Sequence, residues 1–208
     1  CGGGRAGASP SGCDPLADDV VVLGADVDPL GAWVRQAKAR GADPAIAWWL
    51  GRRLGEQFLR ATTPGPGRPV VVPVPTAGPR AAARGLDHAA LLATAVAGAV
   101  GGVTRRGVLR HAGGGRQAGR SRHGRLEAAA GTIRPTGRRL PSGVTAILVD
   151  DVRTTGATVR VAASRLRDAG AGRVVAAVVA TRDRPPDGPG SPPGAAGPGE
   201  GRGAGTIG

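Results

Sequence analysis

Residues 144–158 read VTAILVDDVRTTGAT, and this stretch decides the fold class. It begins with a short apolar run, residues 144–149, of the kind that is buried in a parallel sheet. Two carboxylates, Asp150 and Asp151, follow at the carboxyl end of the predicted strand, where open α/β sheets bind their ligands. Two threonines and a glycine then lead into a predicted helix. The stretch therefore predicts a ligand site at the edge of a parallel sheet.

The chemistry of this turn indicates the kind of ligand. Backbone N–H groups at a helix start lack intrahelical partners and carry partial positive charge, so residues 154–158 would attract a phosphate group. The carboxylates beside them would repel phosphate, and they suit hydroxyl groups or a hydrated metal ion. A ligand with a phosphate at one end and a diol a few ångström away is a phosphorylated sugar. The competing interpretation, ordinary strand-end acids beside an ordinary helix cap, fits a lone Asp-Asp pair better than the whole stretch.

The residues after the turn predict a strand–helix–strand crossover. Apolar residues recur at helical spacing: Val159, Ala162, Ala163, Leu166 and Ala169. Gly170 is a typical stop, and residues 174–179 form a second buried-strand candidate. Strand, helix and strand in this order imply a right-handed parallel crossover.

At residues 144–158 the chain resembles the type I phosphoribosyltransferases, whose signature is an apolar strand, two acidic residues and a Thr-Thr-Gly-type phosphate loop. The resemblance implies an α/β fold with a mainly parallel sheet flanked by helices and a small hood. It also implies that Asp150 and Asp151 are the catalytic pair and bind the ribose hydroxyls of phosphoribosyl pyrophosphate. The residues that would cradle its 5′-phosphate are Thr154, Thr155, Gly156, Ala157 and Thr158. Arg153 lies where family members vary and receives no role.

A narrower resemblance involves segments upstream of residue 144. Residues 70–75 read VVVPVP and are followed by arginines, and residues 117–119 read QAG and are followed by further arginines. This order is similar to the ComF family of competence-associated phosphoribosyltransferase-like proteins. Residues 86–88 read LDH where that family has Phe-Asn-Gln, and Ala128 stands where it has Asn. These departures bear on the acceptor pocket and leave the fold prediction intact.

Two arginine-rich segments are predicted to hold pyrophosphate, because a guanidinium grips phosphate oxygens two at a time. The residues concerned are Arg80, Arg84, Gln117, Arg122 and Arg125. The first two follow a rigid proline-containing loop, and the others lie in residues 111–125, which lack apolar periodicity and are typical of a lid. The alternatives are a solvated basic turn and a basic disordered loop.

Composition predicts one folded domain, residues 18–184, between two segments that lack large apolar residues. On this ground we expect residues 1–17 and the tail, residues 185–208, to be disordered. Because the chain has no methionine, we expect residues 1–17 to be the remnant of a longer amino-terminal segment. ComF-like proteins often begin with a zinc ribbon of two Cys-x-x-Cys pairs. Cys1 and Cys13 do not have that spacing, so we predict no metal ligands here, and an upstream half-ribbon lost with the missing start remains an alternative.

The formal net charge of +13 favours polyanions, either nucleic acid or phosphorylated substrates. Arginine supplies every cation except Lys38, which also fits a GC-rich codon bias. Aromatic residues make up 2% of the chain, so we expect any contact with single-stranded DNA to go to phosphates. No segment has the ~20 apolar residues of a membrane span, and we expect a cytoplasmic protein.

Two helices are predicted at residues 30–40 and 45–59. The apolar residues expected to pack there are Trp33, Trp48, Trp49, Leu50, Leu54 and Phe58. Lys38 followed by Gly41 resembles a ComF pattern and marks Lys38 as a candidate ligand residue.

From these observations we predict an enzyme that binds phosphoribosyl pyrophosphate with Mg²⁺, the ion being held through the pyrophosphate and the ribose hydroxyls. It would transfer ribosyl 5-phosphate to an unidentified nucleophile and release pyrophosphate. The alternative, which the ComF resemblance implies, is a non-catalytic accessory factor in DNA uptake that binds single-stranded DNA and DNA-uptake proteins.

Overall fold

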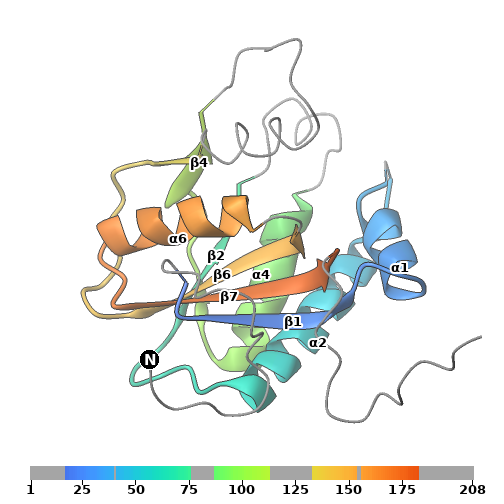
Figure 1. Ribbon diagram of the computed structural model, residues 1–208, viewed down its shortest axis with the longest axis horizontal. Coiled ribbons are helices and arrows are strands. Elements are labelled where there is room, and N and C mark those ends of the chain that lie inside the picture. The colour runs from blue at the N-terminus through green and yellow to red at the C-terminus, as the bar shows by residue number, and fades with distance from the viewer. Residues whose placement is uncertain (1–16, 40, 76–86, 113–132, 154–155, 183–208) are drawn as a thin grey trace, which may run out of the picture.

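The computed structural model describes residues 17–39, 41–75, 87–112, 133–153 and 156–182 (Figure 1). In chain order its elements are β1 (Asp19–Ala25), α1 (Leu30–Ala37), α2 (Pro44–Ala61), β2 (Val70–Pro73), α4 (His88–Val100), β3 (Val103–Thr104), β4 (Leu109–His111), β5 (Ile133–Pro135), β6 (Thr145–Arg153), α6 (Ala157–Asp168) and β7 (Arg173–Thr181). Residues 1–16 and 183–208 lie outside the described part, so the predicted domain boundaries remain predictions. None of the described helices combines the length and the apolar content that crossing a membrane requires.

Five strands form one parallel sheet in the order β1-β7-β6-β2-β3. β6 is the central strand, and β6, α6 and β7 form the parallel crossover that the sequence predicts. β4 and β5 make a separate antiparallel pair. The predicted fold class, a mainly parallel sheet flanked by helices, is confirmed. Because the strands are parallel, their carboxyl ends lie on the same side of the sheet, and the residues that follow the strands lie there together.

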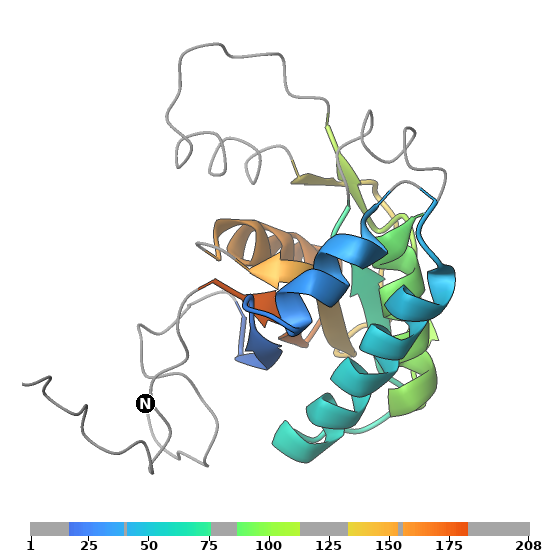
Figure 2. The same ribbon diagram turned by 90° about the vertical axis from the view of Figure 1, so that its right-hand side faces the viewer.

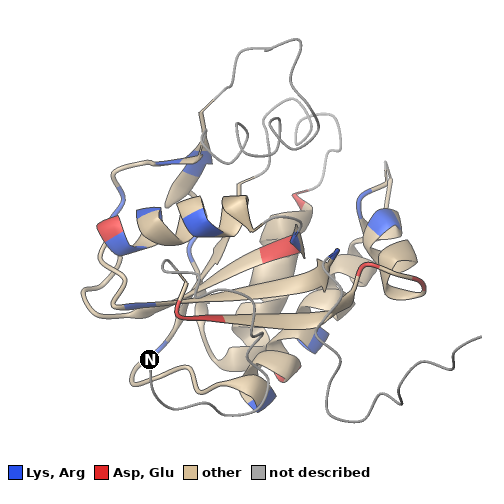
Figure 3. Ribbon diagram, viewed as in Figure 1, with Lys and Arg blue, Asp and Glu red and all other residues tan. Residues whose placement is uncertain are grey.

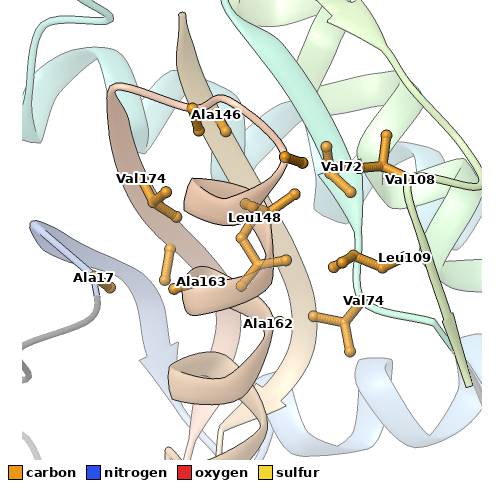
Figure 4. Packing of buried hydrophobic residues seen from close by; sticks show 14 of the residues in the cluster. Ala17, Val72, Val74, Val108, Leu109, Ala146, Leu148, Ala162, Ala163 and Val174 are labelled. Carbon is orange, nitrogen blue, oxygen red and sulfur yellow. The ribbon is translucent and has the colours of Figure 1, made fainter. Parts of the chain in front are cut away.

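The apolar side chains of β6 alternate between the two faces of the sheet, because successive side chains of a strand point to opposite sides. On one face Leu148 packs with Val72 and Val174 of the neighbouring strands and with Ala162 and Ala163 of α6 (Figure 4). The apolar stripe of α6, predicted from its spacing, therefore covers this face. This packing against β6 also determines the position of the first residues of α6 relative to the end of β6.

The other face of the sheet is covered by α2 and α4. Ile147 and Val149 of β6 belong to a cluster that includes Leu50, Leu54 and Phe58 of α2, all three of them buried. The two faces together bury β6 on both sides, which explains its continuous apolar run.

Two glycines let α2 approach α4 closely. A Cβ atom added at Gly51 would lie 2.7 Å from the carbonyl oxygen of Leu92 and 2.7 Å from the Cβ of Ala95. A Cβ added at Gly55 would lie 2.5 Å from the Cβ of Ala99. Real Cβ atoms do not approach other atoms so closely. The two helices can therefore lie at this distance only because residues 51 and 55 are glycines.

The prediction that the three tryptophans are packing residues is wrong. Trp33, Trp48 and Trp49 are 41%, 43% and 45% exposed. The buried stripe of α2 is taken by Leu50, Gly51, Leu54, Gly55 and Phe58, so positions 48 and 49 fall on its outer side. There the rings of Trp33 and Trp49 lie 5.1 Å apart, and the Arg53 guanidinium lies 5.5 Å above the Trp49 ring.

Candidate functional site

The candidate site lies where β6 runs on after its neighbour β2 has ended. β2 pairs with β6 only as far as Pro73 and Val149, whereas β7 pairs with β6 as far as Arg153. The Val74 N–H makes one further bond to the Val149 carbonyl, at 2.8 Å, and the described ladder between β2 and β6 ends there. Asp150 and Asp151 are the first residues of β6 beyond that point, and Figure 3 shows this acidic end of β6 at the edge of the sheet. The sequence predicts them directly after a strand, and the structure includes them in the last part of that strand.

Asp150 holds its proton more tightly than an ordinary carboxyl. Burial raises its pKa from 3.8 to about 7, and the neighbouring charge of Asp151 acts in the same direction. The Asp151 backbone N–H donates a 2.8 Å hydrogen bond to Asp150 Oδ1, and this bond and the Lys38 ammonium oppose the rise in pKa. Near neutral pH the Asp150 carboxyl can therefore either donate or accept a hydrogen bond from a ligand hydroxyl.

Asp151 is paired with a cation from a distant part of the chain. Lys38 Nζ lies 2.8 Å from Asp151 Oδ2, and each side chain is 29% exposed. Lys38 is the residue at which α1 ends, and α1 lies beyond the carboxyl ends of the strands (Figures 1 and 2). The structure thus places this candidate ligand residue beside the acidic pair, while its role toward a ligand remains a prediction.

The turn into α6 has the conformation that a glycine provides. Gly156 is the N-cap of α6 and is left-handed, with φ of 73°, and it makes no side-chain capping bond. Its carbonyl accepts the Arg160 N–H at 2.9 Å, which begins the helix. Gly156 and Ala157 are buried and Thr158 is half-buried. The positive end of the α6 dipole therefore lies a few residues from the acidic pair, as a ligand with both hydroxyls and phosphate requires.

Arg153 is a candidate site residue that the sequence argument missed. A Cβ atom added at Gly156 would lie 3.2 Å from Arg153 Nε, so this guanidinium lies against the start of α6. Within the described residues, Arg153 Nε is buried and has no hydrogen-bond partner. Arginine at this place would add positive charge to the predicted phosphate position. The motif gave no signal for it, because position 153 is variable in the type I phosphoribosyltransferases that the motif resembles.

Several predicted site residues lie outside the described part of the chain: Arg80, Arg84, Gln117, Arg122, Arg125, Thr154 and Thr155. Their roles toward pyrophosphate and the 5′-phosphate stay predictions. The described strand that precedes Arg80 and Arg84 in the sequence, β2, ends on the side of the sheet that carries Asp150.

Gly156→Ala should weaken phosphate binding more than it weakens the fold. A left-handed alanine costs ~1–2 kcal/mol, and the new methyl group must also displace Arg153. Gly137→Ala is the matched control, because Gly137 also has positive φ, of 88°, but would have no neighbour within 4 Å of its Cβ. Thermal melting with and without ribose 5-phosphate should show a loss of stability in both variants, somewhat larger for Gly156→Ala, and a ligand-induced shift that only Gly156→Ala reduces. Equal ligand-induced shifts in melting temperature in both variants would count against a phosphate site at the start of α6.

Stability should fall as pH rises through the titration of Asp150. The unfolded chain releases this proton near pH 3.8 and the folded protein near pH 7, so the folded state is favoured at low pH and loses that advantage between these values. The loss is at most about 1.4 kcal/mol per pH unit. Urea unfolding at pH 5 and pH 8 should show this fall in the wild type and a smaller one in Asp150→Asn. An identical pH dependence in both proteins would mean that Asp150 titrates as an ordinary carboxyl.

Comparison with known proteins gives likenesses of fold and no family assignment. No protein-family model matches the chain, and no curated protein matches its sequence. Among solved structures, TT1426 from Thermus thermophilus is similar with a TM-score of 0.41 and 21% identity, over 68% of this chain and 84% of that one. A hypoxanthine phosphoribosyltransferase from Staphylococcus aureus has a TM-score of 0.40 and 12% identity, over 69% and 68%. The UMP synthase of Leishmania donovani has a TM-score of 0.33 and 19% identity, over 66% and 22%. At these identities and scores the likenesses do not identify a ligand, so the functional argument rests on the site.

Proposed function

We propose that this protein binds phosphoribosyl pyrophosphate with Mg²⁺ and transfers its ribosyl 5-phosphate to a nucleophile. The observation that carries the proposal is the acidic pair at the end of β6, followed directly by a helix with a glycine cap. Carboxyl groups bind a diol, and a helix start binds a phosphate. A ribose 5-phosphate carries both groups at the spacing of one sugar ring. We also propose membership of the ComF family, on the resemblance of residues 70–75 and 117–119, and this membership is compatible with the second candidate described below.

The proposed reaction breaks the bond between C1 of the ribose and the pyrophosphate oxygen. Pyrophosphate leaves with the electron pair, the nucleophile bonds to C1, and the nucleophile loses a proton. Asp150 and Asp151 would hold the two ring hydroxyls and stabilise the positive charge that develops on the sugar. Negatively charged carboxylates beside the ring would stabilise a sugar with the character of an oxocarbenium ion, which is positively charged.

Mg²⁺ would be held mainly by the ligand. Among the described residues, no three His, Cys, Asp or Glu side chains come together in one place. Two carboxyl groups, of which one has a raised pKa and the other is paired with Lys38, suit hydroxyl or water ligands better than a closed metal site. The ion supplies neutralisation of the pyrophosphate charge when it is bound.

A second candidate function is binding of single-stranded nucleic acid without turnover. The observation that favours it is the exposed aromatic group on α1 and α2, where Trp33 lies beside Trp49 and Arg53 covers Trp49. Exposed indole rings with nearby arginines can stack on bases. This differs from the expectation that any DNA contact would go to phosphates alone.

Isothermal titration separates the two candidates. The enzyme proposal predicts saturable binding of phosphoribosyl pyrophosphate that requires Mg²⁺, together with weaker binding of ribose 5-phosphate. The second candidate predicts binding of an oligonucleotide that Trp49→Ala weakens. Failure to bind either sugar phosphate would reject the enzyme proposal.

A further inference from the structure

Lys38 reaches the acidic pair from a rigid base. Val34 and Ala37 of α1 are 4% and 6% exposed, so the end of the helix is anchored in the core. The Lys38 N–H donates to the Arg35 carbonyl at 3.2 Å, which holds its backbone at the C-cap. The backbone from which the Lys38 side chain extends to Asp151 is therefore anchored at the end of α1.

Two other cations described near α1 have partners elsewhere. Arg35 is paired with Asp28 at 2.7 Å, and Arg182 is paired with Asp26 at 2.9 Å. Lys38 is the charge from α1 that is directed to Asp151, a residue more than a hundred positions along the chain. The pairing brings the amino-terminal helix into the candidate site.

This ion pair and the proposed ligand compete for one carboxylate. Asp151 Oδ2 accepts from Lys38 at 2.8 Å, so a sugar hydroxyl that donates to the same oxygen has the Lys38 ammonium as a competitor. Both side chains are partly exposed, so breaking the pair leaves neither charge buried without water. The incoming pyrophosphate is strongly anionic and offers the ammonium a new partner near C1 of the sugar.

We propose that Lys38 is a positioning residue that neutralises the acidic pair in the free protein and transfers to the pyrophosphate when a ribose hydroxyl occupies Asp151. The proposal rests on the proposed function, since it takes the ligand from it. It makes α1 part of the ligand site. It also predicts that Lys38 affects the binding of phosphoribosyl pyrophosphate and of ribose 5-phosphate differently, because only the first of these ligands carries a pyrophosphate.

The test compares Lys38→Met with wild type for two ligands, by titration in the presence of Mg²⁺. Loss of a charge-assisted contact should weaken phosphoribosyl pyrophosphate by about 10- to 100-fold. Ribose 5-phosphate should bind as well as before or more tightly, because its competitor for Asp151 is gone. Arg35→Met is the matched control, since Arg35 lies on the same helix and pairs with Asp28, and it should change neither affinity.

Equal weakening of both ligands by Lys38→Met would overturn the proposal, because it would mean that Lys38 only holds Asp151 in place. A second measurement needs no variant. Lys38 is the only lysine of the chain, so [¹³Cε]lysine labelling gives one side-chain resonance. Mg²⁺–phosphoribosyl pyrophosphate should shift it differently from ribose 5-phosphate, and identical shifts would contradict the transfer. If wild type binds neither sugar phosphate, the proposed function itself has failed, which is a different result from either of these.

Discussion

Replacing Asp150 and Asp151 together by asparagine is expected to abolish binding of phosphoribosyl pyrophosphate while the protein remains folded. At pH 8, above the pKa of Asp150, each lost charge-assisted acceptor costs ~1.5–3 kcal/mol, so the double change should lower affinity by at least about a hundredfold. The fold should tolerate it, because Asn has the same shape and the change removes a carboxyl whose charged form burial disfavours. Isothermal titration and thermal melting measure the two effects separately.

Asp168→Asn is a suitable control for this double variant. Asp168 lies at the far end of α6, is largely exposed and pairs with Arg165 at 3.3 Å. Its replacement should leave ligand affinity unchanged. If the double variant binds the ligand as tightly as wild type, the acidic pair does not hold the sugar.

Gly51→Val is expected to cause the largest loss of stability of the changes considered for the helical layer. Its Cβ would have to lie 2.7 Å from a backbone carbonyl of α4, and a backbone atom cannot rotate away as the end of a side chain can. Overpacking of this kind costs ~1–3 kcal/mol and occasionally more. Chemical unfolding followed by circular dichroism should show a lower midpoint with a similar slope.

The control for Gly51→Val is Gly98→Ala, in the helix on the other side of the same contact. A Cβ at Gly98 would have no neighbour within 4 Å, so this change should stabilise α4 by ~0.5–1 kcal/mol through helix propensity. An unchanged unfolding midpoint for Gly51→Val would show that α2 and α4 can move apart without loss of stability.

The sequence was informative wherever the signal is local. The apolar run of β6, the spacing of α6 and the second run in β7 each predict their own element, and together they predict the crossover that the structure contains. The acidic pair and Gly156 are close in the sequence, so their proximity in the fold follows from it as well.

Contacts between distant segments could not be predicted in the same way. Nothing near Lys38 in the sequence indicates that its ammonium meets Asp151. Arg153 is close to Gly156 in the sequence, but the direction of its side chain toward Gly156 is set by the fold and not by the motif. The tryptophans show a related difficulty. Apolar character predicts burial, yet the buried stripe of α2 was already filled by smaller residues and glycines, so Trp48 and Trp49 remain outside.

The strand order also has a consequence for how the chain reaches its fold. Within the described sheet β1 has a single neighbour, β7, which is the last strand described, and the two are further joined by Arg173 and Asp19 at 2.6 Å. During synthesis β1 therefore lacks its described partner until β7 has emerged. Pairing of such distant segments is slow, and the free edges of β1 and β6 can meanwhile pair with other chains. β7, the last strand described, thus joins β1 to β6, and without it both of these strands lack a partner on the side where β7 would pair.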